Sequence, residues 1–556
     1  MRITLNEMLP LQIVILIASI FWIQSVTIST PNGDILGFST DNTNIYLGIR
    51  YGEIATRWLE ATLPRPWNDT LNATEYGPIC HQYGPFKQLQ PMTESEDCLF
   101  LNIWVPKTSD SSIPVRVWLH GGGYTAGYSN DYDGENLAHL SQSIIVTINY
   151  RLGLFGFFPL PNLTIRNVGL LDQQLALRWV QENIVAFGGD KTNVMLFGES
   201  AGGGSVVAHF IMESSWSLYS SIILESAGPF HMADCQECEK TNLELLETAF
   251  PECQSNLTCF QQLNASRFYQ ELTMNWITLW PCIGQQSQLT EQTMTLIRKG
   301  SFNRRANILG GFNAKEGQSV TLIFNQFNQT ISSTRYYDLA QQYQIPSELI
   351  IRYDPTTTDK DYFNAFAWLL SDYYCNCPTF YLFNHLASIT SSSIYVYYFI
   401  HPTENWAFTP FNLNATHLTE IAYVFHNQFA LTNLTSDEKD LSLKIIDYFT
   451  SFHLSEQPWT SYKNNQTIQI LDIGNDTMKT QFGFDRQLIE KCSYVLKYLD
   501  SDDCHAYLTQ QQCLNISHCQ WFGDHCDEIS TSSAQQYGLS FIVFCFIVPI
   551  SFVLLI

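Results

Sequence analysis

The residues best suited to chemistry surround Ser200. This serine is the centre of the motif 198–202 (Gly-Glu-Ser-Ala-Gly), which follows the apolar run 193–197 and precedes small residues able to begin a helix. A G-x-S-x-G motif between a strand and a helix is typical of a strained turn that raises the serine hydroxyl above a sheet. Glycines tolerate such a turn, and the N-terminus of the following helix favours a developing negative charge. We therefore predict that Ser200 is a nucleophile.

A second glycine-rich segment could stabilise the oxyanion that forms when a serine attacks a carbonyl group. Residues 120–123 (His-Gly-Gly-Gly) follow the apolar run 115–119. Consecutive glycines let backbone N–H groups approach a substrate oxygen closely, as in an HGGG-type loop. The two motifs in this order predict acyl transfer through a serine.

The acid and the base that activate such a serine should follow it in the order serine, acid, histidine. Glu316 is a candidate acid, because it follows the apolar run 306–313 and precedes a glycine, which indicates a loop. The pattern alone does not select the base among five later histidines: His385, His401, His417, His426 and His453. We interpret His209, in the helix expected after the motif, as a core histidine.

Apolar runs that alternate with helix-like segments must position these residues. Residues 170–187 predict a helix, with apolar residues on one face and Gly188-Gly189 as its end. Strands that alternate with helices indicate a mainly parallel sheet with helices on both faces, so the predicted fold class is α/β. The predicted buried strands are 115–120, 143–150, 193–200, 220–227, 306–313 and 393–401.

Five segments together identify a family. They are 95–106 (SEDCLFLNIWVP), 120–127 (HGGGYTAG), 149–157 (NYRLGLFGF), 169–190 (GLLDQQLALRWVQENIVAFGGD) and 193–206 (NVMLFGESAGGGSV). Over residues 30–499 the chain resembles the type B carboxylesterases, which include the cholinesterases and have the α/β-hydrolase fold. The resemblance implies a domain at 28–500 that hydrolyses carboxylic esters through an acyl-enzyme intermediate and needs no cofactor.

The resemblance also implies roles for individual residues. Ser200 matches the family's nucleophile, Glu316 its triad acid and His417 its triad base, whereas His401 matches a position that is not catalytic. The family has H-G-x-E at the base, and Leu418 replaces the glycine here. The matched oxyanion-hole residues are Gly122, Gly123 and Ala201.

One difference argues against a true cholinesterase. Cholinesterases bind the choline ammonium on a tryptophan ring in the loop before the EDCL motif, through a cation–π interaction. In this chain the corresponding residues, 81–97, contain no tryptophan, and Tyr83 and Phe86 are their only aromatic residues. We therefore expect an ester substrate other than a choline ester.

Two alternatives to this esterase remain. Some members of the family are adhesion or binding proteins that have lost the nucleophile, and the presence of Ser200, Glu316 and His417 favours an enzyme. A lipase is the second alternative, because the loops at 275–284 and 406–414, which should shape the pocket, cannot be interpreted from sequence. Glu199, beside the nucleophile, is expected to tune the site.

Size and charge limit the class of partner. The chain has 556 residues, 45% of them hydrophobic, which is enough for one large domain. It contains 28 Lys and Arg residues and 52 Asp and Glu residues, and the resulting net charge of -24 would repel nucleic acid and anionic lipid heads. The expected partner is a small-molecule ester, and the oligomeric state is left open.

The cysteines indicate an oxidising compartment. Without Cys545, in the C-terminal apolar tail, 14 of the 15 cysteines remain, an even number typical of a disulfide-bonded exported protein. The spacing of cysteines and histidines does not indicate a zinc site, so no metal is expected. The resemblance implies the pairs Cys80–Cys98, Cys253–Cys259 and Cys377–Cys492. It leaves open the pairing of Cys235, Cys238, Cys282 and Cys375.

Both ends of the chain indicate export to the cell surface. The apolar run 9–26 behind Arg2 predicts a signal peptide at 1–27. Residues 501–529 contain four cysteines and predict a small segment stabilised by two disulfides. Residues 530–556 predict a GPI-anchor signal, with a single membrane helix as the alternative. Sequons that predict N-glycosylation lie at Asn68, Asn72, Asn162, Asn256, Asn264, Asn328, Asn414, Asn433, Asn465, Asn475 and Asn515.

Overall fold

A computed structural model describes residues 24–528, apart from several short segments. The segments outside the description are 84–91, 230–231, 273–278, 344, 356–359, 405–410, 412, 414, 428–432, 453–460, 463–466, 473–479, 483–489, 496–518 and 523–524. Residues 1–23 and 529–556 also lie outside it, and with them most of the expected signal peptide and the whole expected membrane tail.

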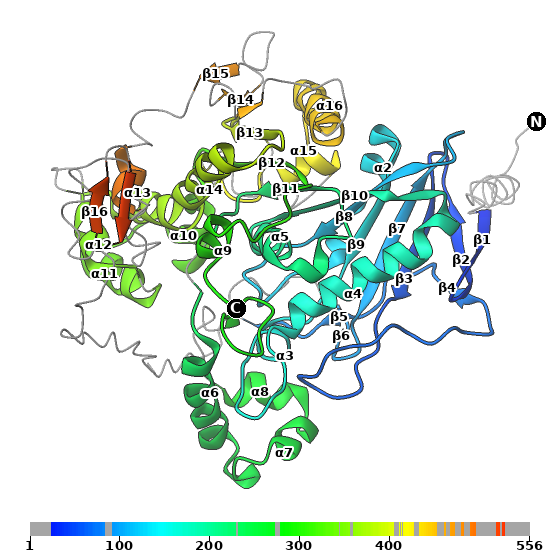
Figure 1. Ribbon diagram of the computed structural model, residues 1–556, viewed down its shortest axis with the longest axis horizontal. Coiled ribbons are helices and arrows are strands. Elements are labelled where there is room, and N and C mark those ends of the chain that lie inside the picture. The colour runs from blue at the N-terminus through cyan, green and yellow to red at the C-terminus, as the bar shows by residue number, and fades with distance from the viewer. Residues whose placement is uncertain are drawn as a thin grey trace, which may run out of the picture.

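A large sheet runs through the described chain (Figure 1). Its strands lie in the order β1-β2-β3-β7-β9-β8-β10-β11-β12-β13-β14-β15, with β4 beside β2. Along this order, neighbouring strands are parallel from β9 to β14 and antiparallel at the two edges, and β4 is parallel to β2. The predicted α/β class with a mainly parallel sheet is therefore confirmed.

The six predicted strands form the centre of this sheet. They are β8 (Ile113–Leu119), β9 (Ile144–Ile148), β10 (Gly189–Glu199), β11 (Ser221–Glu225), β12 (Asn307–Asn313) and β13 (Ile394–Phe399), and they lie side by side. The edges come from strands that the apolar pattern did not reveal: β1 (Gln24–Thr30), β2 (Gly33–Ser39), β3 (Thr43–Arg50), β4 (Leu71–Asn72), β7 (Phe100–Pro106), β14 (Thr467–Leu471) and β15 (Thr480–Phe482). Strands β1 and β2 are partly exposed and alternate polar with apolar residues, so they lack the continuous apolar run by which a buried strand is found in the sequence.

Helices cover both faces of the sheet. Along β10, Leu196 packs with α4 (Val168–Asn183) and α5 (Ala201–Ile211), whereas Phe197 packs on the other face. That second face is covered by α2 (Glu135–Ser141), α15 (Ile421–Phe425) and α16 (Ser436–Ser451). Successive residues of a strand point to opposite faces, so one buried strand contributes to two hydrophobic cores.

The predicted helix at 170–187 is α4 followed by one 3-10 turn at Ile184–Phe187. Gly188 ends this turn with φ +84, a left-handed conformation that favours glycine. The sequence therefore located the helix correctly but did not show that its last turn has 3-10 geometry.

The remaining helices lie around the sheet and beside the site. Near the lower edge of Figure 1 are α6 (Cys235–Ala249), α7 (Leu257–Gln262) and α8 (Ala265–Glu271). The others are α3 (Gly153–Gly156), α9 (Thr293–Arg298), α10 (Gly317–Phe324), α11 (Ser333–Gln342), α12 (Ser347–Tyr353), α13 (Tyr362–Leu370) and α14 (Cys377–Ile389). Between α13 and α14 a π-helical turn, η7 (Ser371–Asn376), interrupts the α-helical geometry.

Four disulfides link the described residues. They are Cys80–Cys98, Cys253–Cys259, Cys377–Cys492 and Cys235–Cys282. The first three are the pairs that the resemblance implies, and the fourth settles two of the cysteines left open. Cys375 is a thiol and departs from the expected full pairing.

Two terminal features bear on the expected domain boundaries. The boundary at residue 27 lies inside β1, whose Gln24 pairs with Ser39 of β2, so the strand would remain whole only if cleavage occurred before Gln24. Within 501–529, the described residues form a hairpin of β16 (Cys519–Phe522) and β17 (His525–Glu528). Across the part of the chain that the structure describes, no helix is long and apolar enough to span a bilayer.

Candidate active site

Ser200 occupies the tight turn between β10 and α5. Its backbone has φ 56 and ψ -121, outside the regions that ordinary residues adopt. A Cβ at Gly202 would lie 1.9 Å from the carbonyl oxygen of Leu119, and a Cβ at Gly198 would lie 2.7 Å from the carbonyl carbon of Gly202. Both glycines of the motif are therefore required by close backbone contacts, as the sequence predicted.

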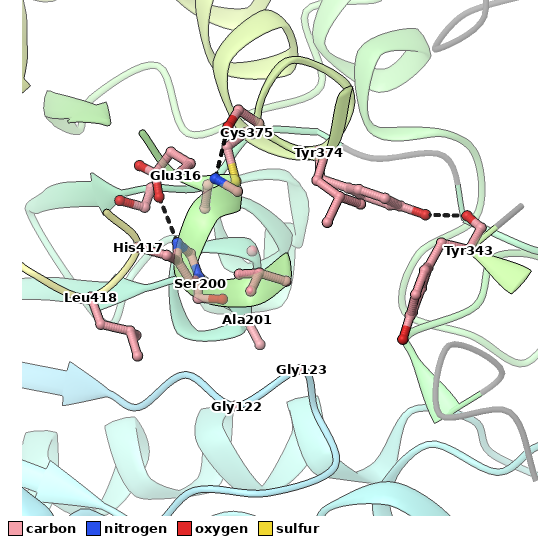
Figure 2. A pocket seen from close by; sticks show the side chains of 18 of the residues that line it. Gly122, Gly123, Ser200, Ala201, Glu316, Tyr343, Tyr374, Cys375, His417 and Leu418 are labelled. Carbon is pink, nitrogen blue, oxygen red and sulfur yellow. Dashed lines mark hydrogen bonds and ion pairs between the residues drawn. The ribbon is translucent and has the colours of Figure 1, made fainter. Parts of the chain in front are cut away.

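The glycine loop after β8 faces this turn. Figure 2 shows Gly122 and Gly123 across from Ser200 and Ala201, at the floor of a cavity. Gly122 has φ +110, and a Cβ there would lie 2.2 Å from the carbonyl oxygen of Ala126. Ala201 is the first residue of α5, so its N–H has no acceptor within the helix. These donors can serve a negatively charged oxygen next to Ser200.

Glu316 and His417 come from two loops that run side by side. Glu316 lies just after β12, and the N–H of Lys315 donates to the carbonyl oxygen of Ala415. Nδ1 of His417 lies 2.6 Å from Oε2 of Glu316, and the backbone N–H of Asn313 donates to Oε1 at 2.6 Å. The acid is thus held at both oxygens, and it fixes the orientation of the imidazole.

The other histidines have different surroundings. His401 lies 3.1 Å from Asp472 and 3.3 Å from Glu438, so it links β13 to α16. His209 contacts Ser215 and Gln173, and burial lowers its pKa to about 3, as expected of a core histidine.

The ring of His385 lies 6.4 Å from that of Tyr381. His426 contacts Ser442, and His453 lies outside the described residues. Among the described histidines, His417 is the one that lines the cavity beside Ser200.

A group of buried carboxyl groups surrounds His417. Oε1 of Glu199 lies 3.2 Å from Nε2 of the imidazole. Burial lowers the pKa of His417, but the carboxylates of Glu199 and Glu316 outweigh it and raise that pKa to about 10. Burial also raises the pKa of Glu199. Both shifts favour a proton on this pair of groups.

Glu420 is a further buried acid that the sequence analysis did not assign. It accepts hydrogen bonds from Ser226, at 2.7 Å, and from the Asn313 side chain. Burial and the charge of Glu316 raise its pKa to about 7. The sequence held a signal for this residue, because Glu420 is the acid of the family's H-G-x-E pattern. Its hydrogen-bond partners, however, are distant in sequence.

The cavity above Ser200 has a volume of about 140 Å³ and mostly apolar walls. Ser200, Glu316 and His417 all line it, together with Cys375 from η7. Its apolar and aromatic walls include Tyr124, Trp280, Val320, Phe324, Tyr343, Leu370, Tyr374 and Leu418. Such a cavity suits the apolar part of a small ester.

Three residues bear on substrate recognition. Tyr83 stacks on Tyr269, with ring centroids 5.8 Å apart, and does not line the cavity; Phe86 lies outside the described residues. The aromatic wall is instead formed in part by Trp280, whose ring lies 6.0 Å from that of Tyr374. Much of the two loops expected to shape the pocket, 275–284 and 406–414, lies outside the described residues.

Comparisons with known proteins agree with this geometry. The profile of the carboxylesterase family matches residues 24–489. The chain is 29% identical to an acetylcholinesterase of Bungarus fasciatus, over 86% of this chain and 87% of that protein. It is 29% identical to a cholinesterase of Mus musculus, over 76% and 78% of the two chains. It is 41% identical to a para-nitrobenzyl esterase of Bacillus subtilis (strain 168), over 36% and 43%.

Proposed function

Because the chain belongs to the carboxylesterase family, we propose that it is a serine hydrolase that cleaves carboxylic esters through an acyl-enzyme intermediate. One observation carries this proposal. Ser200, the Glu316–His417 pair and the glycine loop converge on a single cavity from four separate parts of the chain. An adhesion protein of the same fold would not need this arrangement.

The proposed reaction has two steps. His417 accepts the Ser200 proton at Nε2 as Oγ attacks the ester carbonyl. Any proton already on Nε2 first passes to Glu199, whose Oε1 lies 3.2 Å away. The N–H groups of Gly122, Gly123 and Ala201 stabilise the oxyanion. His417 then protonates the leaving alcohol and activates the water that releases the acid, while Glu316 stabilises the imidazolium.

The cavity walls support an uncharged ester as substrate. The described lining is mostly apolar and aromatic, and residues 81–97 lack the tryptophan that binds choline in cholinesterases. Acetylcholine should therefore be no better a substrate than an uncharged ester of similar size. A strong preference for acetylcholine that is lost in Trp280→Ala would instead make that ring an ammonium site.

Two measurements test the activity itself. A fluorophosphonate probe reacts with an activated serine, so it should label the wild-type chain and not Ser200→Ala. A series of p-nitrophenyl esters with increasing acyl length should then be hydrolysed, with the short esters preferred. Failure of both labelling and hydrolysis would favour the adhesion alternative, and a preference for long chains would favour a lipase.

We further propose that the enzyme is exported, glycosylated and held at the outer cell surface. Four disulfides are typical of an oxidising compartment. The 1–27 and 530–556 segments have the composition of a signal peptide and a GPI-anchor signal. The Cys-rich segment 501–529 would then lie between the catalytic domain and the membrane.

A further inference from the structure

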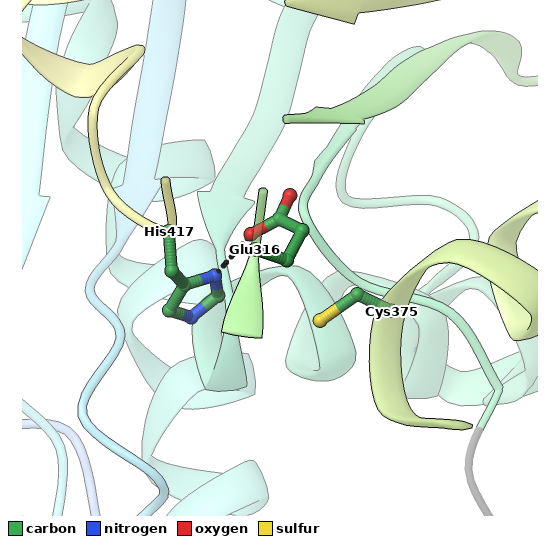
Figure 3. Close-up of side chains that lie close together, drawn as sticks. All are labelled: Glu316, Cys375 and His417. Atoms are coloured by element: carbon green, nitrogen blue, oxygen red, sulfur yellow. Dashed lines mark hydrogen bonds and ion pairs between the residues drawn. The ribbon is translucent and has the colours of Figure 1, made fainter. Parts of the chain in front are cut away.

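A thiol lies next to the acid and the base, in a position that the esterase reaction does not use. The sulfur of Cys375 points toward Glu316 and the His417 ring (Figure 3). One potential ligand atom from each of these three residues lies within 4.8 Å of the other two. The three residues are far apart in the amino-acid sequence, which is why no cysteine and histidine spacing revealed the cluster.

The three side chains form a ligand set that zinc(II) prefers. Thiolate sulfur, imidazole nitrogen and carboxylate oxygen bind zinc at about 2.0–2.3 Å, which places tetrahedral ligand atoms roughly 3.3–3.8 Å apart. Shifts of about 1 Å in the side chains would satisfy this geometry. All three residues line the cavity, so an ion can enter by the substrate's route, and the fourth position can be filled by water.

The surrounding structure holds this cluster in place. Oε1 of Glu316 accepts a hydrogen bond from the Asn313 N–H, which leaves Oε2 directed at His417. Cys375 belongs to the π-helical turn η7, and the disulfide Cys377–Cys492 begins two residues later. Ligands that are already ordered lose little conformational entropy when an ion binds.

We propose that Glu316, Cys375 and His417 form an inhibitory site for zinc(II) and similar thiophilic divalent cations. The ion replaces the hydrogen bond between Nδ1 of His417 and Oε2 of Glu316. The Sγ–H proton of Cys375 and the Nδ1 proton of His417 pass to water as the Sγ–metal and Nδ1–metal bonds form. Metal binding rests on the cluster alone, whereas inhibition also rests on the proposed role of His417 as base.

Inhibition follows from the loss of the Glu316–His417 pair. A cation on Nδ1 disfavours a second positive charge on the ring, so Nε2 becomes a poor acceptor for the Ser200 proton. Zinc(II) should therefore lower ester turnover. Magnesium(II) prefers six oxygen ligands and should have no effect at the same concentration.

The first experiment measures inhibition of p-nitrophenyl acetate hydrolysis by zinc chloride with the full-length chain. Each variant's rate is normalised to its own metal-free rate. Zinc should inhibit the wild type reversibly, with recovery on addition of EDTA. Cys375→Ser and Cys375→Val should each raise the half-inhibitory concentration by about tenfold or more, because one of three ligands is lost. Cys238→Ser, which alters a cysteine outside the cavity, should leave it unchanged.

The second experiment measures metal binding without turnover. Cadmium(II) bonded to a thiolate absorbs in the ultraviolet, so titration of Ser200→Ala with cadmium chloride should produce this band at one equivalent. The band should be absent from the Ser200→Ala, Cys375→Ser double variant. Equal zinc inhibition of the wild type and both Cys375 variants, or no Cys375-dependent band, would overturn the proposal. A Cys375-dependent band together with no esterase activity in the wild-type chain would support the metal site and contradict the proposed function instead.

Discussion

At the scale of single residues, the assignment of the base is the most direct prediction. Ser200→Ala and His417→Ala should each lower ester turnover by about 10⁴-fold or more, because nucleophile and base act as a unit. His401→Ala should have a much milder effect on turnover, since His401 contacts Glu438 and Asp472 away from the cavity. The measurement is kcat/KM on p-nitrophenyl acetate. A severe loss in His401→Ala with a mild one in His417→Ala would reverse the assignment.

Leu418 gives a second residue-scale prediction. It lines the cavity beside His417 and has φ +76, a conformation that suits the glycine of the family pattern. Leu418→Gly should have a higher melting temperature than Leu418→Ala, because it relieves about 1 kcal/mol of backbone strain that alanine keeps, and it should speed hydrolysis of bulkier esters. Leu418→Ala is the matched control, because it enlarges the cavity and keeps the strain.

Comparison of these two variants separates the effect of cavity size from the effect of backbone strain. Faster hydrolysis of bulky esters in both variants, with a higher melting temperature in Leu418→Gly than in Leu418→Ala, is the expected pattern. If neither variant changes the ratio of rates for bulky and small esters, Leu418 does not limit the size of the substrate.

At the scale of elements, the contact between β8 and α5 positions the nucleophile against the oxyanion loop. A Cβ at Gly202 would lie 1.9 Å from the carbonyl oxygen of Leu119, so the helix would have to move away from the strand. Gly202→Ala should destabilise the fold by about 1–3 kcal/mol and lower turnover by about 10²-fold. Thermal unfolding and kcat together test this.

Gly153→Ala serves as the control for that contact. Gly153 has φ +48, but a Cβ there would meet nothing closer than 3.6 Å, so its cost is conformational. It should lower the melting temperature with little effect on kcat. Normal turnover in Gly202→Ala would show that the β8–α5 contact does not set the catalytic geometry.

At the scale of the whole molecule, the surface is consistent with a glycoprotein. All seven sequon asparagines within the described residues are exposed: Asn68, Asn72, Asn162, Asn256, Asn264, Asn328 and Asn433. Protein expressed in eukaryotic cells should therefore lose mass in several steps on partial digestion with peptide N-glycosidase F. An unchanged mass would contradict N-glycosylation.

Membrane attachment is a separate whole-molecule prediction. If residues 530–556 direct GPI attachment, phosphatidylinositol-specific phospholipase C should release active esterase from intact cells. Mass spectrometry of the mature C-terminus is the control, because some GPI lipids resist this enzyme. A peptide from 539–556 in the mature protein would contradict the anchor and support a single membrane helix.

The sequence by itself determined the fold class, the central strands and the family. Buried parallel strands are continuous apolar runs, and the G-x-S-x-G and HGGG motifs are local, so both are visible in a linear pattern. The resemblance implied Glu316 and His417 before their 2.6 Å contact was known. Residue patterns alone did not select the base among five histidines, because the partner of a loop residue depends on which loops the sheet brings together.

Only the tertiary structure decided which distant groups meet. It brought Glu420 to Ser226, 194 residues away, and it paired Cys235 with Cys282. It also left Cys375 as a thiol beside Glu316 and His417. Nothing in the local sequence encodes these contacts, since they follow from the order of parallel strands, whose carboxyl ends gather separate loops at one edge of the sheet.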